Sequence, residues 1–412
     1  EINKDLLSKS RMFRIIQGDV GSGKTIVSFL TIINVIKSDY QCALMSPTEI
    51  LAKQHYELAK KIFKNENFKI DFLSGKTEYK KRKIILKNIE DGSTKLLIGT
   101  HALFQKNINF KKLGLAVIDE QHKFGVKQRS ELAKKGGNNC DVLLMSATPI
   151  PRTMMMSLYG DMDISKITEK PSVRKKIITY SKPEKKINDL WDYIKKQIDE
   201  KNQIFWVCPL IDASKILDYS SAVNRFNFIE KKFPKKVGLI HGSLDKIEKE
   251  KILNKFLKKE ISILVSTTVI EVGIDFPNAN LIIIENANKF GLSQLHQLRG
   301  RVGRGKDQSY CILVFKNNLS ENAKKRIKIL KDSNDGFLIS EEDMKLRGFG
   351  DILGFKQSGI KNFKLADPIL HEDLFELAQN EIARIENSNY DLSKYKTLVK
   401  LFDQAEIIND LA

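Results

Sequence analysis

The sequence is poor in the residues that build disulfide frameworks and zinc sites. Its 412 residues include only four cysteines, Cys42, Cys140, Cys208 and Cys311, which lie far apart and form no C-x-x-C pair. The six histidines are also dispersed, and none forms an H-E-x-x-H or Cys/His cluster. We therefore predict neither zinc nor disulfides, and the isolated thiols favour a reducing cytoplasm.

Long apolar segments are absent too. No run approaches the roughly 18 residues of a membrane span, although 42% of the residues are hydrophobic. Nothing at the N-terminus resembles a signal peptide, and no short-period repeat or low-complexity tract is evident. We therefore expect a soluble chain without membrane contact, long enough for two ordinary domains and a tail.

Arginine is scarce in a strongly basic chain. The net charge is +19 and the pI is about 9.5, which favours a polyanionic partner such as nucleic acid. A general compositional bias is the alternative explanation, because lysine, isoleucine and asparagine are abundant throughout. Of the thirteen arginines, however, Arg299, Arg301 and Arg304 fall within six residues.

Short continuous apolar runs alternate with longer amphipathic stretches in the first part of the chain. Runs without alternation suit strands buried on both faces, and the intervening helices imply a parallel sheet. The predicted strands are Phe13 to Ile16, Ala43 to Met45, Leu96 to Ile98, Leu115 to Ile118 and Val142 to Met145. At one helix start, Ser46 is the expected N-cap, with Pro47 at the first helical position and Glu49 three residues after the cap.

The pattern pauses around Ser165 to Lys176, where we place a linker, and then restarts. The second set of predicted strands comprises Ile204 to Val207, Val237 to Ile240, Ile263 to Val265, Leu281 to Ile284 and Tyr310 to Val314. Helices are expected near Lys185 to Glu200, Asp245 to Lys258 and Asn322 to Lys331. We predict two tandem α/β domains, 1–167 and 168–332, and a mostly helical C-terminal segment, 333–412.

Two motifs in the first domain indicate nucleotide chemistry. The stretch from Gly18 to Thr25 reads Gly-Asp-Val-Gly-Ser-Gly-Lys-Thr, in which Gly18, Gly21, Ser22 and Gly23 shape a loop whose N–H groups face an anion. Lys24 is expected to reach the β- and γ-phosphates, and Thr25 to ligate Mg²⁺. Asp119, after an apolar run, is the expected second magnesium anchor, and Glu120 is expected to polarise the attacking water. These residues predict an ATP-hydrolysing site.

The arginine cluster suggests the other half of that site. Hydrolysis needs positive charge on the developing γ-phosphoryl group, and an arginine supplied across an interface can provide it. If the segment from Gln297 to Arg304 faces the phosphate loop, Arg301 and Arg304 become the catalytic arginines and hydrolysis requires the two lobes to close. An exposed basic turn is the alternative interpretation of this segment.

The ordered motifs resemble those of superfamily 2 helicases, and more closely the RecG family of bacterial branched-DNA helicases. The resemblance extends from about Met12 to Gly359. It rests on the phosphate loop, Asp119-Glu120-Gln121-His122-Lys123-Phe124-Gly125, Ser146 to Thr153, Cys208-Pro209-Leu210-Ile211, Ser266 to Asp275, Phe290 to Arg304 and Leu346 to Gly359. It implies two RecA-like motor lobes that use ATP and Mg²⁺.

The resemblance also implies roles for further residues. Gly273, Asp275 and Gln297 would contribute to the nucleotide site, and Ser146, Ala147, Thr148 and His122 would couple nucleotide state to lobe movement and DNA. The residues that would hold a DNA strand by its backbone are Pro47, Thr48, Gly99, Thr100 and His101 in the first lobe and His241 and Thr267 in the second. The segment from Arg347 to Gln357 resembles the family's translocation motif, although Phe349, Phe355 and Lys356 depart from its usual residues.

The activity that the resemblance implies is ATP-driven helicase and translocase action on replication forks and Holliday junctions in recombination and repair. It implies a bacterial, nucleoid-associated monomer with branched and double-stranded DNA as partner, together with single-strand DNA-binding protein. The family's N-terminal wedge domain is not found in the sequence, so we expect a motor fragment. Two alternatives stay open: a transcription-repair coupling translocase acting with RNA polymerase, and an inactive nucleotide-gated DNA clamp.

Overall fold

The computed structural model describes all residues except 106, 121–139, 148–161, 170–174, 210–214, 268–275, 306, 317–318, 348–370 and 388–412. Five of the predicted site residues lie outside the described residues: His122, Thr148, Gly273, Asp275 and Gln357. For Arg347 the structure describes only the backbone, which ends a helix.

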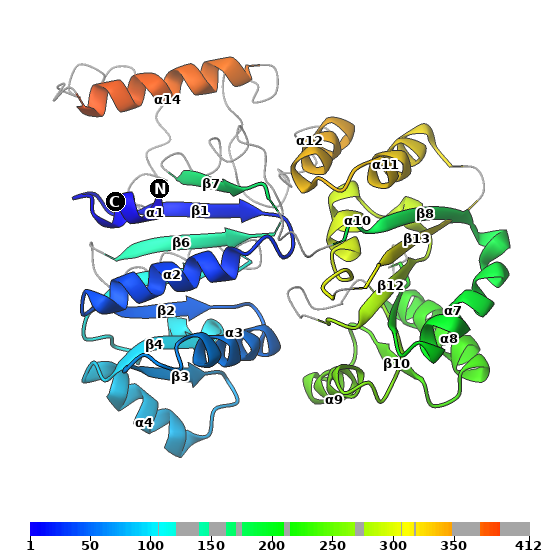
Figure 1. The fold of residues 1–412 in the computed structure, drawn as a ribbon, viewed down its shortest axis with the longest axis horizontal. Coiled ribbons are helices and arrows are strands. Elements are labelled where there is room, and N and C mark those ends of the chain that lie inside the picture. The colour runs from blue at the N-terminus through cyan, green and yellow to red at the C-terminus, as the bar shows by residue number, and fades with distance from the viewer. Residues whose placement is uncertain are drawn as a thin grey trace. The chain divides into compact units, whose positions relative to one another are not determined.

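Seven strands form the first sheet, in the spatial order β3-β4-β2-β5-β6-β1-β7 (Figure 1). Their bounds are β1 (Phe13–Gly18), β2 (Gln41–Met45), β3 (Lys69–Leu73), β4 (Thr94–Gly99), β5 (Leu113–Ile118), β6 (Asp141–Ser146) and β7 (Asp163–Ile167). The helices of this part are α1 (Ile2–Leu6), α2 (Lys24–Lys37), α3 (Glu49–Ile62), α4 (Tyr79–Glu90) and the 3₁₀ helix η1 (His101–Phe104). We refer to these elements, from α1 to β7, as the first lobe.

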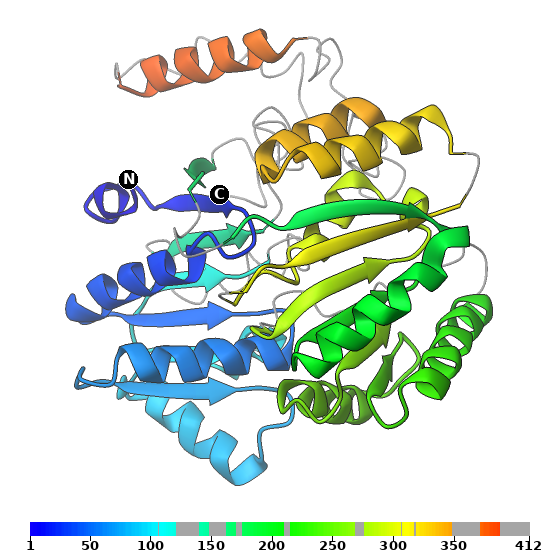
Figure 2. The ribbon, with the colours of Figure 1, turned by 45° about the vertical axis from the view of Figure 1, so that its right-hand side comes forward.

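Six strands form the second sheet, in the order β10-β11-β9-β12-β13-β8, which Figure 2 turns toward the viewer. They are β8 (Ile178–Pro183), β9 (Gln203–Val207), β10 (Val237–Ile240), β11 (Ile263–Ser266), β12 (Ala279–Ile284) and β13 (Tyr310–Phe315). The helices are η4 (Glu184–Leu190), α7 (Trp191–Asp199), α8 (Lys215–Lys232), α9 (Lys246–Leu257), η5 (Ala287–Lys289), α10 (Leu292–Arg299), α11 (Glu321–Asp332) and α12 (Gly336–Arg347). Of these elements, those from β8 to α11 are the second lobe, and α12 belongs to the segment that follows it.

Every strand pair whose register the structure describes is parallel, in both sheets. Parallel pairing requires a crossover between successive strands and leaves both faces of the sheet covered. Accordingly, every residue of β2, β5, β9 and β12 is buried. The predicted α/β class with two parallel sheets is confirmed.

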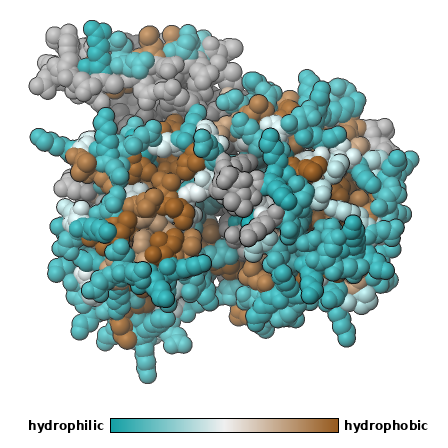
Figure 3. All heavy atoms as spheres, viewed as in Figure 1, coloured by the Kyte–Doolittle hydropathy of each residue, from teal (hydrophilic) through white to brown (hydrophobic). Residues whose placement is uncertain are grey.

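The helices bury one face against these sheets. On α2, Phe29, Ile32 and Ile36 enter the core of the first lobe. The outer face of the same helix carries Ile26 and Leu30, which are 47% and 61% exposed, and Figure 3 shows apolar residues gathered over this region. None of the helices that the structure describes has the length and apolarity to span a bilayer.

Three details of the sequence-based expectation were wrong or incomplete. The N-cap of α3 is Thr48, whose hydroxyl accepts from the N–H of Leu51 at 3.3 Å, whereas Ser46 is buried at the end of β2. The expected helix near Lys185 to Glu200 divides into η4 and α7. Strands β3, β7 and β8 were not predicted, and each lies at the edge of its sheet.

The chain divides into two compact units. One comprises Glu1–Pro149 and Ile164–Asp343 and includes nearly all of both sheets. The other comprises Ile150–Asp163 and Met344–Ala412 and contains α14 (Glu372–Asn387), an amphipathic helix on which Leu374, Leu377 and Ile382 are exposed.

Candidate functional site

The loop between β1 and α2 has the backbone conformation that its glycines allow. Gly21 and Gly23 adopt φ values of 76° and 99°, in the left-handed region that other residues rarely enter. A Cβ on Gly18 would lie 2.4 Å from the hydroxyl oxygen of Ser22 and 3.2 Å from Ile167. Packing therefore requires glycine at position 18, and the backbone conformation favours it at positions 21 and 23.

Lys24 is the first residue of α2, and Thr25 follows it. The ammonium of Lys24 donates to the carbonyl oxygens of Gly18 at 2.7 Å and Asp19 at 2.9 Å, so it folds back over the loop. Burial lowers the pKa of Lys24, while the neighbouring carboxylates of Glu120 and Asp119 oppose that change. The lysine is thus a partly desolvated cation at a helix N-terminus, an arrangement suited to phosphate.

The acidic pair follows β5 directly. Asp119 continues the strand through its N–H, which donates to the carbonyl of Met45 at 2.8 Å. Its carboxylate is held on both oxygens: Oδ2 contacts Nε2 of His55 at 2.8 Å, and Oδ1 accepts from the N–H of Glu120 at 2.9 Å. Sequence reasoning did not place His55 at the site, and the structure shows that it holds the carboxylate of Asp119. The signal available in the sequence was one polar residue on the apolar face of α3.

Glu120 combines an unusual backbone conformation with a raised pKa. Its φ of 51° is uncommon for a residue with a side chain, and such conformations cluster at functional sites. Burial and the adjacent Asp119 raise the pKa of Glu120 to about 7, against the opposing effects of Lys24, Arg301 and a backbone hydrogen bond from Ala147. The pKa of this carboxyl therefore lies where it can exchange a proton near neutral pH.

The three clustered arginines have different environments. The guanidinium of Arg299 forms hydrogen bonds at the end of α11. It donates to the carbonyl oxygens of Leu330 at 2.6 Å and Ser333 at 2.8 Å. Burial, followed by Arg304, lowers the pKa of Arg301 to about 10, and Glu120 opposes this change. Arg304 contributes to lowering the pKa of Lys24. Arg301 and Arg304 thus lie close enough to Glu120 and Lys24 of the first lobe for their charges to influence the pKa values of these groups.

Nη1 of Arg301 and the hydroxyl oxygen of Ser22 are buried at this site and have no hydrogen-bond partner among the described residues. Buried donors are normally paired, and an unpaired one costs about 1–3 kcal/mol. A triphosphate supplies many acceptor oxygens, so these residues fit a nucleotide.

The predicted DNA-contacting residues gather at the carboxyl ends of parallel strands, where ligands bind in open α/β sheets. Gly99 ends β4, and a Cβ there would lie 2.0 Å from the carbonyl oxygen of Leu73. Thr100 is buried, while His101 is exposed at the start of η1. Pro47 and Thr48 follow β2 and are half-buried.

The second lobe supplies a similar set. His241 follows β10 and Thr267 follows β11, and both are buried. The hydroxyls of Ser266 and Thr267 have no partner within the described part of the chain. Gln297 is half-buried on α10, and in the first lobe Ser146 pairs with Gln17 in the register of β6 and β1.

Comparison with known proteins identifies three successive family models along the chain. The DEAD/DEAH box helicase model matches residues 2–157, and the helicase conserved C-terminal domain model matches residues 185–306. The model of the C-terminal part of domain 3 of the ATP-dependent DNA helicase RecG matches residues 333–403.

Individual relatives agree with these models. The chain is 46% identical to the ATP-dependent DNA helicase RecG of Synechocystis sp. over 95% of its own length and 47% of that protein. For the RecG of Bacillus subtilis the identity is 44%, covering 93% of this chain and 56% of the relative. A solved structure of RecG bound to a three-way DNA junction matches with a TM-score of 0.77 and 41% identity, covering 91% of this chain and 49% of that one. The chain thus spans about half the length of these relatives.

Proposed function

From the premise that this chain resembles the RecG helicases over more than nine-tenths of its length, we propose that it is the ATP-driven motor of a branched-DNA helicase. The observation that supports the proposal is that charges of the second lobe influence groups of the first: Arg301 opposes the rise that burial causes in the pKa of Glu120, and Arg304 adds to the lowering that burial causes in the pKa of Lys24. In this proposal both lobes contribute to the nucleotide site, so hydrolysis depends on their relative position. This dependence is what converts a nucleotide cycle into movement.

Each residue has a distinct task in this proposal. Lys24 binds the β- and γ-phosphates, and Glu120 in its ionised form orients and polarises the attacking water. Arg301 and Arg304 stabilise the charge that develops on the γ-phosphoryl group. Magnesium, when bound, would neutralise phosphate charge. Thr25 and Asp119 would hold it through oxygen atoms, the ligands that Mg²⁺ prefers.

The proposed DNA path follows the carboxyl edges of the two sheets. Thr48, Thr100 and His101 of the first lobe and His241 and Thr267 of the second offer hydroxyl, imidazole and backbone groups there. Such groups bind phosphate and sugar, which carry no sequence information, and therefore suit a motor that moves over any sequence. The net charge of +19 adds a sequence-independent attraction.

We further propose the division of the chain into lobes at 1–167 and 168–332, followed by a translocation segment and tail at 333–412. The last strand of the first sheet ends at Ile167 and the first strand of the second begins at Ile178, so the proposed boundary falls between two hydrogen-bonded sheets. Branched and double-stranded DNA would be the substrate, and Arg347 to Gln357 would transmit movement to it. Single-strand DNA-binding protein would be a further partner of the monomer.

The test is ATP hydrolysis measured with linear duplex, single strand, fork and four-way junction. We expect turnover to be stimulated most by the branched DNAs. Lys24→Ala should abolish it, whereas Lys37→Ala, an exposed lysine at the other end of α2, should leave it unchanged. Equal stimulation by linear and branched duplex would favour a general duplex translocase. No turnover with any DNA would favour the inactive clamp.

A further inference from the structure

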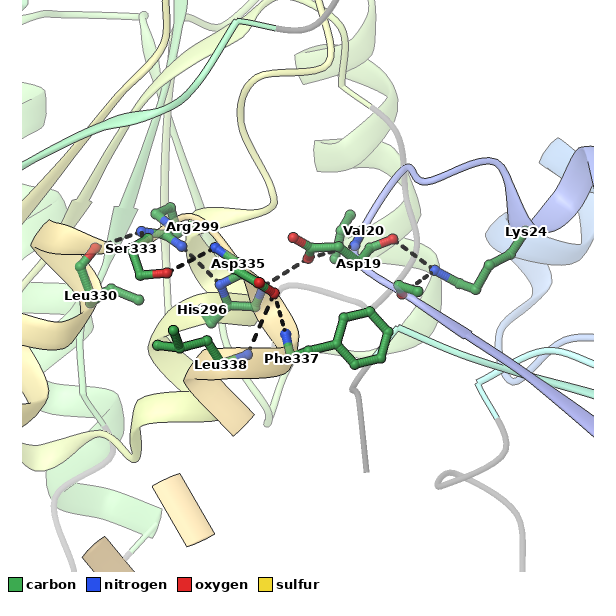
Figure 4. A network of polar contacts seen from close by, with 11 residues as sticks. Asp19, Val20, Lys24, His296, Arg299, Leu330, Ser333, Asp335, Phe337 and Leu338 are labelled. Carbon is green, nitrogen blue, oxygen red and sulfur yellow. Dashed lines mark hydrogen bonds and ion pairs between the residues drawn. The ribbon is translucent and has the colours of Figure 1, made fainter. Parts of the chain in front are cut away.

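A buried hydrogen bond joins the phosphate loop to the second lobe. Nε2 of His296, on α10, lies 2.7 Å from Oδ1 of Asp19 in the loop (Figure 4). The two side chains are 277 residues apart in sequence, and both are buried, with Asp19 6% and His296 5% exposed. Asp19 occupies a variable position of the nucleotide-binding motif, so the motif itself assigns it no role.

The neighbouring arginine determines where the imidazole carries its hydrogen. Nη2 of Arg299 lies 2.9 Å from Nδ1 of His296, and a guanidinium can only donate. Nδ1 is therefore the accepting nitrogen, which leaves the hydrogen on Nε2, where it is donated to Asp19. A neutral imidazole thus connects a buried carboxylate to a buried guanidinium.

The far end of this chain of contacts is firmly held. Arg299 is 1% exposed and donates to the carbonyl oxygens of Leu330 and Ser333, at the end of α11 and just after it. The start of α12 covers the other side of the pair. A Cβ on Gly336 would lie 2.9 Å from Nε2 of His296 and 3.2 Å from Cγ of Asp19. The position of the imidazole is therefore fixed by α10, by the end of α11 and by the start of α12.

At the near end, Asp19 shapes the phosphate loop. Its carboxylate also accepts from the N–H of Val20 at 2.8 Å, and its carbonyl accepts from Lys24 at 2.9 Å and from the N–H of Ser22 at 3.1 Å. A carboxylate in a loop that holds a triphosphate would repel the ligand if it turned inward. The bond to His296 holds it toward the second lobe, with the charge of Arg299 behind it.

We propose that Asp19, His296 and Arg299 form an interlobe relay in which His296 is a positioning residue that keeps the phosphate loop ready for nucleotide. This inference rests on the proposed ATPase function. The relay makes the affinity for ATP depend on docking of the second lobe, and linkage then requires that nucleotide strengthen that docking. Because Arg299 binds the α11–α12 junction, the same contacts connect the nucleotide site to the helix that ends at Arg347.

Steady-state ATP hydrolysis at saturating DNA tests the relay. Loss of a hydrogen bond to a charged group corresponds to about a tenfold to hundredfold change in affinity. We expect His296→Ala and Asp19→Ala each to raise the KM for ATP about tenfold, while kcat falls less than about threefold. The double variant should be no worse than either single one, because both remove the same interaction.

Two further variants separate the relay from general damage. His296→Gln retains a donor and an acceptor and should restore most of the affinity. Gly336→Ala, which alters no polar group, should raise KM severalfold by displacing the imidazole, and it tests the relay if the His296 variant does not fold. Glu250→Gln is the control: it removes another contact between the lobes, the exposed pair of Lys76 and Glu250 at 2.6 Å, and should leave KM within about twofold.

Several outcomes would refute the proposed relay and would leave the proposed ATPase function unaffected. These are an unchanged KM in His296→Ala, additive effects of the two alanine substitutions, or a His296→Gln variant as impaired as His296→Ala. In each case the wild-type chain would still hydrolyse ATP. Failure of the wild-type chain to hydrolyse ATP at all would instead refute the proposed function.

Discussion

Replacing Glu120 by glutamine should stabilise the nucleotide-free protein above neutral pH. The pKa of Glu120 is raised from 4.5 to about 7, chiefly by burial and then by Asp119. The folded protein therefore favours the protonated carboxyl. Between about pH 4.5 and pH 7 the folded state binds more protons than the unfolded state, so stability falls as pH rises through this window. Glutamine has the size of the protonated acid and carries no charge, so it escapes this loss.

The expected gain in unfolding free energy follows from the same pKa shift. Moving a pKa from 4.5 to about 7, at about 1.4 kcal/mol for each pH unit, amounts to about 3 kcal/mol, an upper value for the gain above pH 8. At pH 4.5 and below, wild type and variant should have nearly the same stability. The substitution should also stop ATP hydrolysis, because the amide no longer activates water, so stability is gained at the expense of activity.

Urea unfolding at pH 4.5 and pH 8, followed by far-UV circular dichroism without nucleotide, measures the difference in unfolding free energy between wild type and variant. Both tryptophans, Trp191 and Trp206, lie in the second lobe. The unfolding midpoint reported by their fluorescence should therefore change less and serves as an internal reference. A variant no more stable than wild type at pH 8 would refute the argument. An equal gain at both pH values would do the same, because it would exclude the ionised carboxyl as the cause.

Three other outcomes are expected. Arg304→Ala should slow hydrolysis by about 10³-fold or more while calorimetric titration still detects nucleotide binding, and a change in affinity alone would exclude Arg304 as the catalytic arginine. The logarithm of DNA affinity should fall linearly with the logarithm of salt concentration, and a flat response in a fluorescence anisotropy titration would remove the phosphate-contact argument. Gly99→Ala should destabilise the first lobe by about 2 kcal/mol or more, because its Cβ would lie 2.0 Å from the carbonyl oxygen of Leu73. The matched control is Gly75→Ala, where a Cβ meets nothing within 4 Å; equal thermal unfolding temperatures for the two variants would contradict this reasoning.

The strands that could be predicted are mainly those buried on both faces. Central strands such as β5 and β12 are continuous apolar runs, and the sequence shows them directly. The edge strands β3, β7 and β8 mix polar and apolar residues, with only one or no fully buried position each. An edge strand is covered on fewer sides, so it needs no continuous apolar run and leaves a weak pattern.

The sequence by itself determined the two-sheet class and the ordered motifs of the nucleotide site. It could do so because strand burial and phosphate loops depend on residues that are close together in the chain. Only the tertiary structure decided which side chains serve those motifs from a distance: His55 beside Asp119, and His296 and Arg299 behind Asp19. An isolated histidine carries no signal of its partner, because the partner is chosen by the packing of helices and strands far apart in sequence.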